Sequence, residues 1–366
     1  MAVAVALLAS GCASEPSRKP LELPEITAET SIRVVWQVPG GDLGHAALRP
    51  AANADAVFIA APDGRLGRYR AGEPVWEIAT KLPISGGVST DGEIVVVGTS
   101  KGEVVAFATN DGSERWRARV SSEVLAPPVF AGDRILVRSG DHRLFALDAR
   151  DGTRQWVMQR TTPALTLRVT TPPVFAENFA FLGYPGGKLL AVGVANGAVL
   201  WEGSVALSKG TTELERIADI AGSPVLGPRE VCAAAYQGRV ACFDLSSGNL
   251  IWAQEVSADS SIALDSSNIY VADTDGVVHA YARADGKLVW QQDALKWRRL
   301  GAPLVRRGFL LVGDGSGVLH ALRLSDGALV GRLASDGGGF SSDPVIAGDT
   351  TIYQTRRGGV LAVELD

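Results

Sequence analysis

Seven of the eight tryptophans recur at a near-regular interval, and this repeat restricts the chain to few folds. Each follows a turn and a short apolar stretch, as in DGSERW and ADGKLVW, and is preceded by two hydrophobic stretches joined by a Gly-bearing turn. A period of roughly 40 to 50 residues with alternating apolar positions and Asp-Gly turns is typical of β-propeller blades. The seven residues are Trp36, Trp76, Trp116, Trp156, Trp201, Trp252 and Trp290.

Eight strand–turn–strand sets can be aligned on this repeat, although the eighth tryptophan position holds Gly331. The pattern predicts an all-β fold, an eight-bladed propeller of four-stranded antiparallel blades. We expect the indoles to pack as wedges between neighbouring sheets, one per blade. The sets begin near Val57, Ile94, Ile135, Phe179, Val231, Ile269, Phe309 and Thr351.

The two ends of the repeat region complete each other. The last set stops at Asp366 with no tryptophan strand after it, while the strand around Trp36 has no blade before it. A first strand donated to the last blade would close the ring and remove its open sheet edges. We therefore expect the propeller to span residues 32–366.

The N-terminus reads as an export signal. Ala2 to Cys12 is an apolar run ending in small residues, too short to span a bilayer. Its end, LLASGC, resembles the bacterial lipobox, which implies removal of residues 1–11 and lipidation of Cys12. Residues 12–31 would then carry the lipid on a flexible tether, since they are rich in Pro, Ser and Glu. The alternative is an ordinary signal peptide that contains a cysteine.

Charge and motifs argue against several classes of function. A net charge of −5 provides no basic field for nucleic acid. No GxSxG elbow or EF-hand spacing occurs, so we predict neither catalytic residues nor a cofactor. The histidines, His45, His142, His279 and His320, lack metal-ligand spacing, and we predict no metal site. His279 and His320 occupy the same position in adjacent repeats. This favours repeat inheritance, in which both were copied with the repeat, over a metal site.

Cys232 and Cys242 lie on consecutive strands of one predicted hairpin, whose turn falls near Gln237 and Gly238. Their Cα atoms could therefore come within disulfide range. Thiols of exported proteins tend to oxidise, and no base lies nearby to activate a cysteine. We interpret the pair as a candidate disulfide.

Two neighbouring connections break the even repeat. The segments after Trp156 and Trp201, residues 161–173 and 206–224, are the longest links between a tryptophan strand and the next inner strand. Equivalent positions in successive repeats emerge side by side on one face, and insertions there usually mark a binding face. This geometry predicts a partner-binding surface.

The composition of these connections suggests a protein partner. Leu165, Leu167 and Arg168 place two alternating apolar side chains beside a guanidinium, which is typical of an interface anchor. The second connection offers the carboxylates of Glu213, Glu215 and Asp219. The alternative is that the connections only pack on each other, with Arg168 paired to Asp219.

The chain resembles the BamB family of outer-membrane assembly lipoproteins, most specifically in PALTLR at 163–168, ELERIADI at 213–220 and AAAYQGRVACFDLSSGNLIW at 233–252. The resemblance implies a non-enzymatic scaffold of the β-barrel assembly (BAM) machinery, lipid-anchored on the periplasmic face of the outer membrane. Leu165, Leu167, Arg168 and Asp219 match positions that dock on the POTRA domains of the barrel subunit, BamA. A second acidic position of the family is Ala221 here.

The same resemblance implies further partners, namely other BAM lipoproteins reached indirectly and unfolded outer-membrane proteins. Two alternatives come from other classes of function. A quinoprotein dehydrogenase would share the repeat, but it is usually larger and carries cofactor ligands, including a vicinal cysteine pair that this chain lacks. A periplasmic propeller that binds sugar or cell wall would need exposed aromatic side chains on one face.

Overall fold

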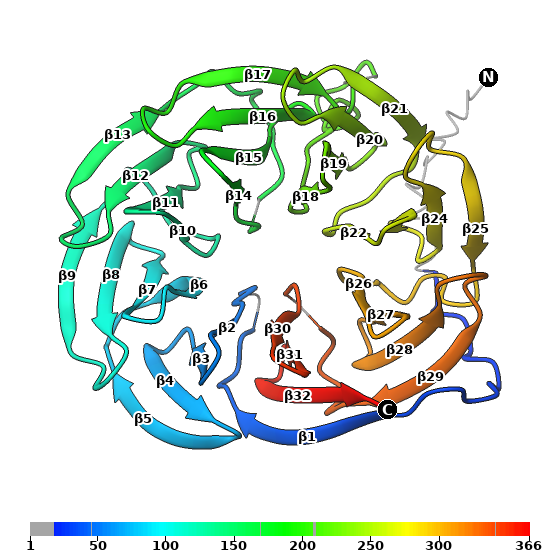
Figure 1. The fold of residues 1–366 in the computed structure, drawn as a ribbon, viewed down its shortest axis with the longest axis horizontal. Coiled ribbons are helices and arrows are strands. Elements are labelled where there is room, and N and C mark those ends of the chain that lie inside the picture. The colour runs from blue at the N-terminus through cyan, green and yellow to red at the C-terminus, as the bar shows by residue number, and fades with distance from the viewer. Residues whose placement is uncertain (1–17, 45, 169, 208–209, 341) are drawn as a thin grey trace, which may run out of the picture.

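The computed structural model describes residues 18–366 except 45, 169, 208–209 and 341. Eight four-stranded antiparallel sheets stand as blades around a central axis (Figure 1). All named elements within these residues are strands, which confirms the predicted all-β, eight-bladed propeller. The signal segment, Cys12 and His45 lie outside the described residues. No helix in the described part of the chain is long and apolar enough to cross a membrane.

The blades follow one another along the chain, each running from an inner to an outer strand. Blade 1 is β2 (Ala51–Ala52), β3 (Val57–Ala60), β4 (Arg65–Arg70) and β5 (Glu73–Ala79). Blade 2 is β6 (Ile84–Thr90), β7 (Ile94–Thr99), β8 (Glu103–Ala108) and β9 (Glu114–Arg119). Blade 3 is β10 (Val129–Ala131), β11 (Arg134–Arg138), β12 (Leu144–Asp148) and β13 (Arg154–Met158). Blade 4 is β14 (Val174–Ala176), β15 (Phe179–Tyr184), β16 (Lys188–Gly193) and β17 (Val199–Ser204).

The second half of the ring continues this order. Blade 5 is β18 (Val225–Leu226), β19 (Glu230–Ala234), β20 (Arg239–Asp244) and β21 (Leu250–Glu255). Blade 6 is β22 (Ala263–Leu264), β23 (Asn268–Ala272), β24 (Val278–Ala282) and β25 (Leu288–Gln292). Blade 7 is β26 (Leu304–Arg306), β27 (Phe309–Gly313), β28 (Val318–Arg323) and β29 (Leu329–Ala334). Blade 8 is β30 (Val345–Ala347), β31 (Thr350–Gln354), β32 (Gly359–Leu365) and the N-terminal strand β1 (Ile32–Pro39).

The two ends of the described chain close the ring as predicted. β1 pairs antiparallel with β32, from Ile32 opposite Leu365 to Pro39 opposite Gly359. The backbone nitrogen of Asp366 also donates to the carbonyl of Ser31 (3.1 Å). The first strand therefore completes the last blade as its outer, fourth strand, and all eight blades have four strands.

The repeated tryptophans wedge between blades, as expected. In six of them the indole Nε1 donates to a backbone carbonyl of the next blade, as from Trp252 to Arg283 (2.9 Å). Gly286, in the turn that follows Arg283, has φ of 73°, and a Cβ atom there would lie 2.5 Å from Cε3 of Trp252. The Asp-Gly turn thus supplies both the left-handed backbone and the space that the preceding indole occupies.

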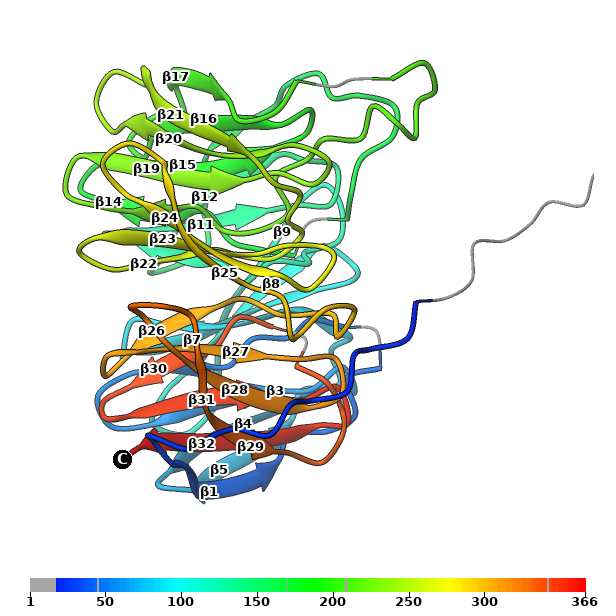
Figure 2. The same ribbon diagram turned by 90° about the vertical axis from the view of Figure 1, so that its right-hand side faces the viewer.

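Each blade passes to the next on one face of the ring, which we call the loop face. It carries the connections from each outer strand to the next inner strand and the turns between the second and third strands of each blade. The opposite face, the turn face, carries the other two sets of turns. In Figure 2 the loop face lies on the right, and the longest loops project there from blades 3 to 5.

The sequence predicted a flexible tether over residues 12–31, and its described part makes specific contacts. Residues 18–31 lie along the outside of blades 6 and 7 (Figure 2). Leu21 donates to the carbonyl of Lys296 (3.1 Å) and Glu29 to that of Val330 (2.9 Å).

Candidate partner-binding face

Two loops of the loop face form the candidate site. The first, residues 159–173, joins β13 to β14, and the second, residues 205–224, joins β17 to β18. They lie side by side, as the sequence predicted, and are tied directly to each other. Thr171 Oγ1 donates to the carbonyl of Ala221 (2.8 Å), and Ser223 Oγ to that of Pro172 (3.2 Å). Ala221, for which the resemblance implied an acidic residue, thus contributes its backbone carbonyl.

The predicted contact residues of the first loop differ in exposure. Leu165 is 44% exposed, whereas Leu167 is half-buried. The side chain of Arg168 is 75% exposed, and its nearest acidic partner is Glu123 at 3.7 Å. The alternative pairing of Arg168 with Asp219 is therefore wrong. Leu165 and Arg168 are presented to solvent, where a partner can reach them.

Asp219, the predicted contact residue of the second loop, is buried with 1% of its surface exposed. Its Oδ2 accepts a hydrogen bond from the backbone of Leu167 (2.6 Å) and its Oδ1 one from Gly186 (2.7 Å). Its own carbonyl accepts from the backbone of Tyr236 (2.9 Å). A carboxylate used in this way organises the surrounding loops and has no surface to offer a partner.

A buried polar cluster supports the first loop from below. Burial of Arg138 lowers the pKa of its guanidinium to about 10, and the nearby Asp219 carboxylate only partly offsets this shift. His142 Nε2 lies 3.0 Å from Thr166 Oγ1, and burial lowers the pKa of this histidine, with Arg138 adding to the shift. The ring of His142 meets that of Tyr184 edge-on. The loop therefore rests on fixed polar groups.

The remaining acids of the second loop have different roles. Glu215 accepts hydrogen bonds from the backbone of Thr212 (3.0 Å) and Thr211 (2.8 Å), which lower the pKa of its carboxyl. It shapes its own turn. Glu213 is also exposed, and its carboxylate lies 3.6 Å from the guanidinium of Arg216.

Two exposed leucines of the second loop were missed by the sequence reasoning. Leu207 is 61% exposed and Leu214 is 68% exposed, more than Leu165. Both stand alone in a polar insertion that we interpreted through its acids. The sequence could have indicated their exposure, because both leucines lie in a polar insertion outside the repeated strands.

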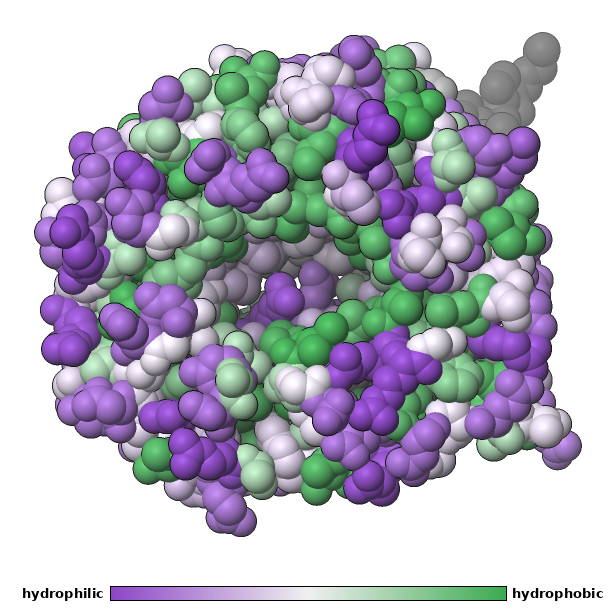
Figure 3. Space-filling model, in the orientation of Figure 1, coloured by the Kyte–Doolittle hydropathy of each residue, from purple (hydrophilic) through white to green (hydrophobic). Residues whose placement is uncertain are grey.

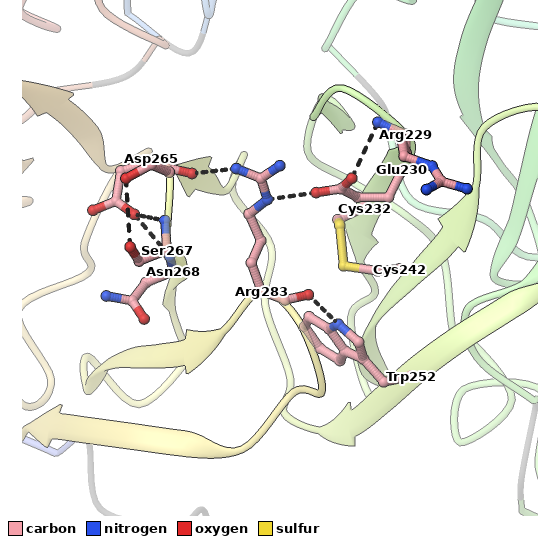
Figure 4. Close-up of polar contacts among 10 residues, drawn as sticks. Arg229, Glu230, Cys232, Cys242, Trp252, Asp265, Ser267, Asn268 and Arg283 are labelled. Atoms are coloured by element: carbon pink, nitrogen blue, oxygen red, sulfur yellow. Dashed lines mark hydrogen bonds and ion pairs between the residues drawn. A yellow bond between two sulfur atoms is a disulfide. The ribbon is translucent and has the colours of Figure 1, made fainter.

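The candidate disulfide lies away from these loops, inside blade 5. Cys232 on β19 is directly opposite Cys242 on β20, and the structure joins them by a disulfide with Cα atoms 4.1 Å apart (Figure 4). Beside it, Arg283 of blade 6 reaches Glu230 (2.5 Å) and the carbonyl of Asp265 (2.7 Å). Figure 4 shows that this polar contact and the indole of Trp252 join the same two blades.

Two of the three histidines within the described residues, His279 and His320, support equivalent turns of neighbouring blades. His279 Nε2 lies 2.9 Å from Asp273, and His320 Nε2 lies 3.1 Å from Asp314, each aspartate opening the turn before its histidine. These equivalent pairs show repeat inheritance, as expected. Among the described residues no three His, Cys, Asp or Glu side chains are arranged to hold a metal ion.

The central channel widens to a cavity of about 390 Å³ at the loop face. Three arginines and several acids line it, among them Arg49, Arg299, Arg356 and Asp259, and burial raises the pKa of Asp259. Figure 3 shows the opposite mouth of the channel, on the turn face, which is bordered largely by apolar side chains. Phe130 and Phe175 of the inner strands line the wall of the channel.

A family profile and individual relatives point to the same family. The sequence profile of the family described as "Outer membrane protein assembly factor BamB" matches residues 33–292 and 274–366. The outer membrane protein assembly factor BamB of Bordetella pertussis is 40% identical over 364 residues, 98% of this chain and 94% of that protein.

Solved structures show the same resemblance. The crystal structure of BamB from Moraxella catarrhalis superposes with a TM-score of 0.85 at 26% identity, over 91% of this chain and 99% of that one. A quinohemoprotein alcohol dehydrogenase from Pseudomonas putida superposes with a TM-score of 0.74 over 91% of this chain and 76% of that one. Its identity is 11%, so this likeness concerns the fold alone.

Proposed function

This chain belongs to the BamB family of outer membrane protein assembly factors, and we propose that it is a non-enzymatic scaffold of the BAM machinery that docks on the POTRA domains of BamA. The observation that carries the proposal is the pair of tied loops, which present Leu165, Leu207 and Leu214 to solvent. Leucines exposed on two adjoining, projecting loops give this face apolar area for contact with a protein partner.

Charge around these leucines would orient a partner. Arg168 extends from the first loop and Glu213 from the second, both largely exposed. A partner surface with an apolar recess flanked by an acid and a base would complement them. Arg168 can bind a carboxylate through two parallel hydrogen bonds, which adds geometric specificity.

The loops are held in shape before a partner arrives. Asp219 ties the backbone of Leu167 to that of Gly186, and Thr171 ties the two loops to each other. Pre-organised loops lose less conformational entropy on binding, which favours affinity. We propose that Asp219 acts in docking by positioning Leu167 and its neighbours.

The proposed setting is the periplasmic face of the outer membrane, with the chain held there by acyl chains on Cys12. Other lipoproteins of the machinery would be reached through BamA. Unfolded outer-membrane proteins are a further proposed partner, because outer strands expose aliphatic side chains such as Leu250 and Ile251 beside an unpaired sheet edge.

A binding measurement with matched leucines tests the docking surface. The loop variant changes Leu165, Leu207 and Leu214 to Ala. The control changes Leu200, Leu250 and Leu288, leucines of comparable exposure on three outer strands, to Ala. Affinity for purified POTRA domains should fall in the loop variant and stay unchanged in the control, with circular dichroism verifying the fold. Equal affinity of the two variants would refute the assigned face.

A further inference from the structure

The segment before β1, residues 18–31, crosses the outside of blades 6 and 7 from the turn face to the loop face (Figure 2). We call it the strap. At the turn face the backbone nitrogens of Glu29 and Thr30 both donate to the carbonyl of Val330 (2.9 and 3.4 Å). The carboxylate of Glu29 forms an ion pair with Arg323.

At the loop face the strap is held by two arginines and by an apolar contact. Arg332 donates to the carbonyl of Pro24 (3.2 Å), and Arg298 to that of Leu21 (2.9 Å). Leu23 packs on the core between blades 6 and 7. Arg298 is itself held by Asp314 (2.6 Å), which is fully buried, so the strap rests on fixed groups.

Thr30 occupies the tryptophan position that the repeat lacks. Its side chain is buried, and a Cβ atom on Gly331 would lie 3.0 Å from its Cγ2. Its Oγ1 donates to the carbonyl of Asp366 (2.9 Å), which follows β32 just as Leu324, the acceptor of the Trp290 indole, follows β28. The strap therefore occupies part of the place of the missing indole and supplies the equivalent hydrogen bond.

The strap leaves the ring at the loop face. Lys296, bonded to Leu21, lies in the connection from β25 to β26. Asp275, which pairs with Arg18 at 3.2 Å, lies in the turn from β23 to β24. Both segments belong to the loop face, as do the two docking loops.

We infer that the strap fixes the exit of the lipid anchor beside blade 6, so that the loop face is turned toward the lipid surface of the membrane. The inference rests on the proposed lipidation of Cys12. Six residue steps separate Cys12 from Arg18, and a chain of that length reaches at most about 20 Å. A six-residue strand such as β16 rises by a similar distance, roughly 20 Å.

These two lengths favour one orientation. A tail that starts at the loop face would have to be fully extended along the blade merely to bring Cys12 level with the turn face, so the bound strap disfavours contact between the turn face and the lipid surface. The docking loops would then meet their partner in the layer close to the membrane. A longer tail, or a detached strap, would remove this restriction.

Energy transfer from two labels on blade 6 to acceptor-labelled lipid headgroups tests the orientation. Thr274→Cys places a donor on the loop face and Ser266→Cys places one on the turn face, both at exposed residues. Lipidated full-length chain in liposomes should show higher transfer from position 274 than from 266. A flexible Gly-Ser insertion between residues 17 and 18 should reduce that difference.

Equal transfer from the two positions, or higher transfer from position 266, would overturn the inference. Mass spectrometry that finds no acyl chain on Cys12 would also overturn it. Docking on soluble POTRA domains does not depend on the strap, so a loss of docking with the transfer difference intact would refute only the proposed function.

Discussion

The backbone nitrogen of Leu167 donates a 2.6 Å hydrogen bond to Oδ2 of Asp219 across 52 residues of sequence. Both residues belong to the proposed docking surface, yet here Asp219 holds Leu167 in place. Exposed residues and buried supports therefore differ within this proposed surface, and substitutions can separate them.

Asp219→Ala should loosen the first loop while the ring stays folded. Two backbone donors, of Leu167 and Gly186, would lose a buried acceptor, at about 1–3 kcal/mol each. We expect faster hydrogen exchange at the Leu167 amide and weaker POTRA binding. Glu213→Ala, at an exposed acid, is the control and should leave that exchange rate unchanged. Equal exchange in both variants would show that Asp219 does not hold the loop.

Gly286→Ala should destabilise the junction of blades 5 and 6. A left-handed alanine costs about 1–2 kcal/mol, and crowding of the Trp252 indole adds about 1–3 kcal/mol. Gly132 has a similar φ but open space around it, so Gly132→Ala should lower the free energy of unfolding only by the backbone cost of about 1–2 kcal/mol. Urea unfolding measures both variants. Equal losses of unfolding free energy in the two variants would show that the Trp252 indole moves aside with no energetic penalty.

Reduction of the Cys232–Cys242 disulfide should lower the free energy of unfolding by about 2–3 kcal/mol, the chain-entropy value for a closure of 10 residues. Urea unfolding of the chain from residue 18 onward, with and without reductant, measures the change. Cys232→Ala/Cys242→Ala should not respond to reductant. An unchanged midpoint in the parent chain, with both thiols shown free by alkylation, would contradict the expected stabilisation.

The His320–Asp314 pair should make blade 7 less stable in acid. Burial lowers the pKa of His320, so the unfolded chain binds a proton more readily below about pH 6.5 and stability falls from there. Burial also opposes ionisation of Asp314, but hydrogen bonds from His320, the Val318 backbone and Arg298 keep its pKa at about 2. Its contribution is therefore lost only as pH falls from about 4 toward 2.

Urea midpoints between pH 7.5 and 5 measure the histidine effect separately from the carboxylate effect. His320→Gln should show a flatter dependence on pH than the parent chain, since it removes a group that takes up a proton on unfolding. His142, whose pKa burial also lowers, contributes in the same direction and remains in this variant. Identical slopes in the parent chain and the variant would refute the assignment to His320.

Much of the fold was predictable because it is written in local, repeated patterns. The tryptophan interval and the Asp-Gly turns predicted eight blades, and the unmatched ends at Trp36 and Asp366 predicted the closure. Each of these signals acts between residues close in sequence or between equivalent positions of adjacent blades. The place of the two docking loops followed from the same equivalence.

The sequence by itself thus determined the ring, its closure and the face that carries the long loops. Only the tertiary structure decided that Asp219 is buried, that Leu207 and Leu214 are exposed, and that Thr30 fills the place of the missing tryptophan at Gly331. The physical reason is that burial of a loop side chain, and the filling of a vacant core position, depend on distant segments that meet only after the ring has closed. No local period encodes such meetings.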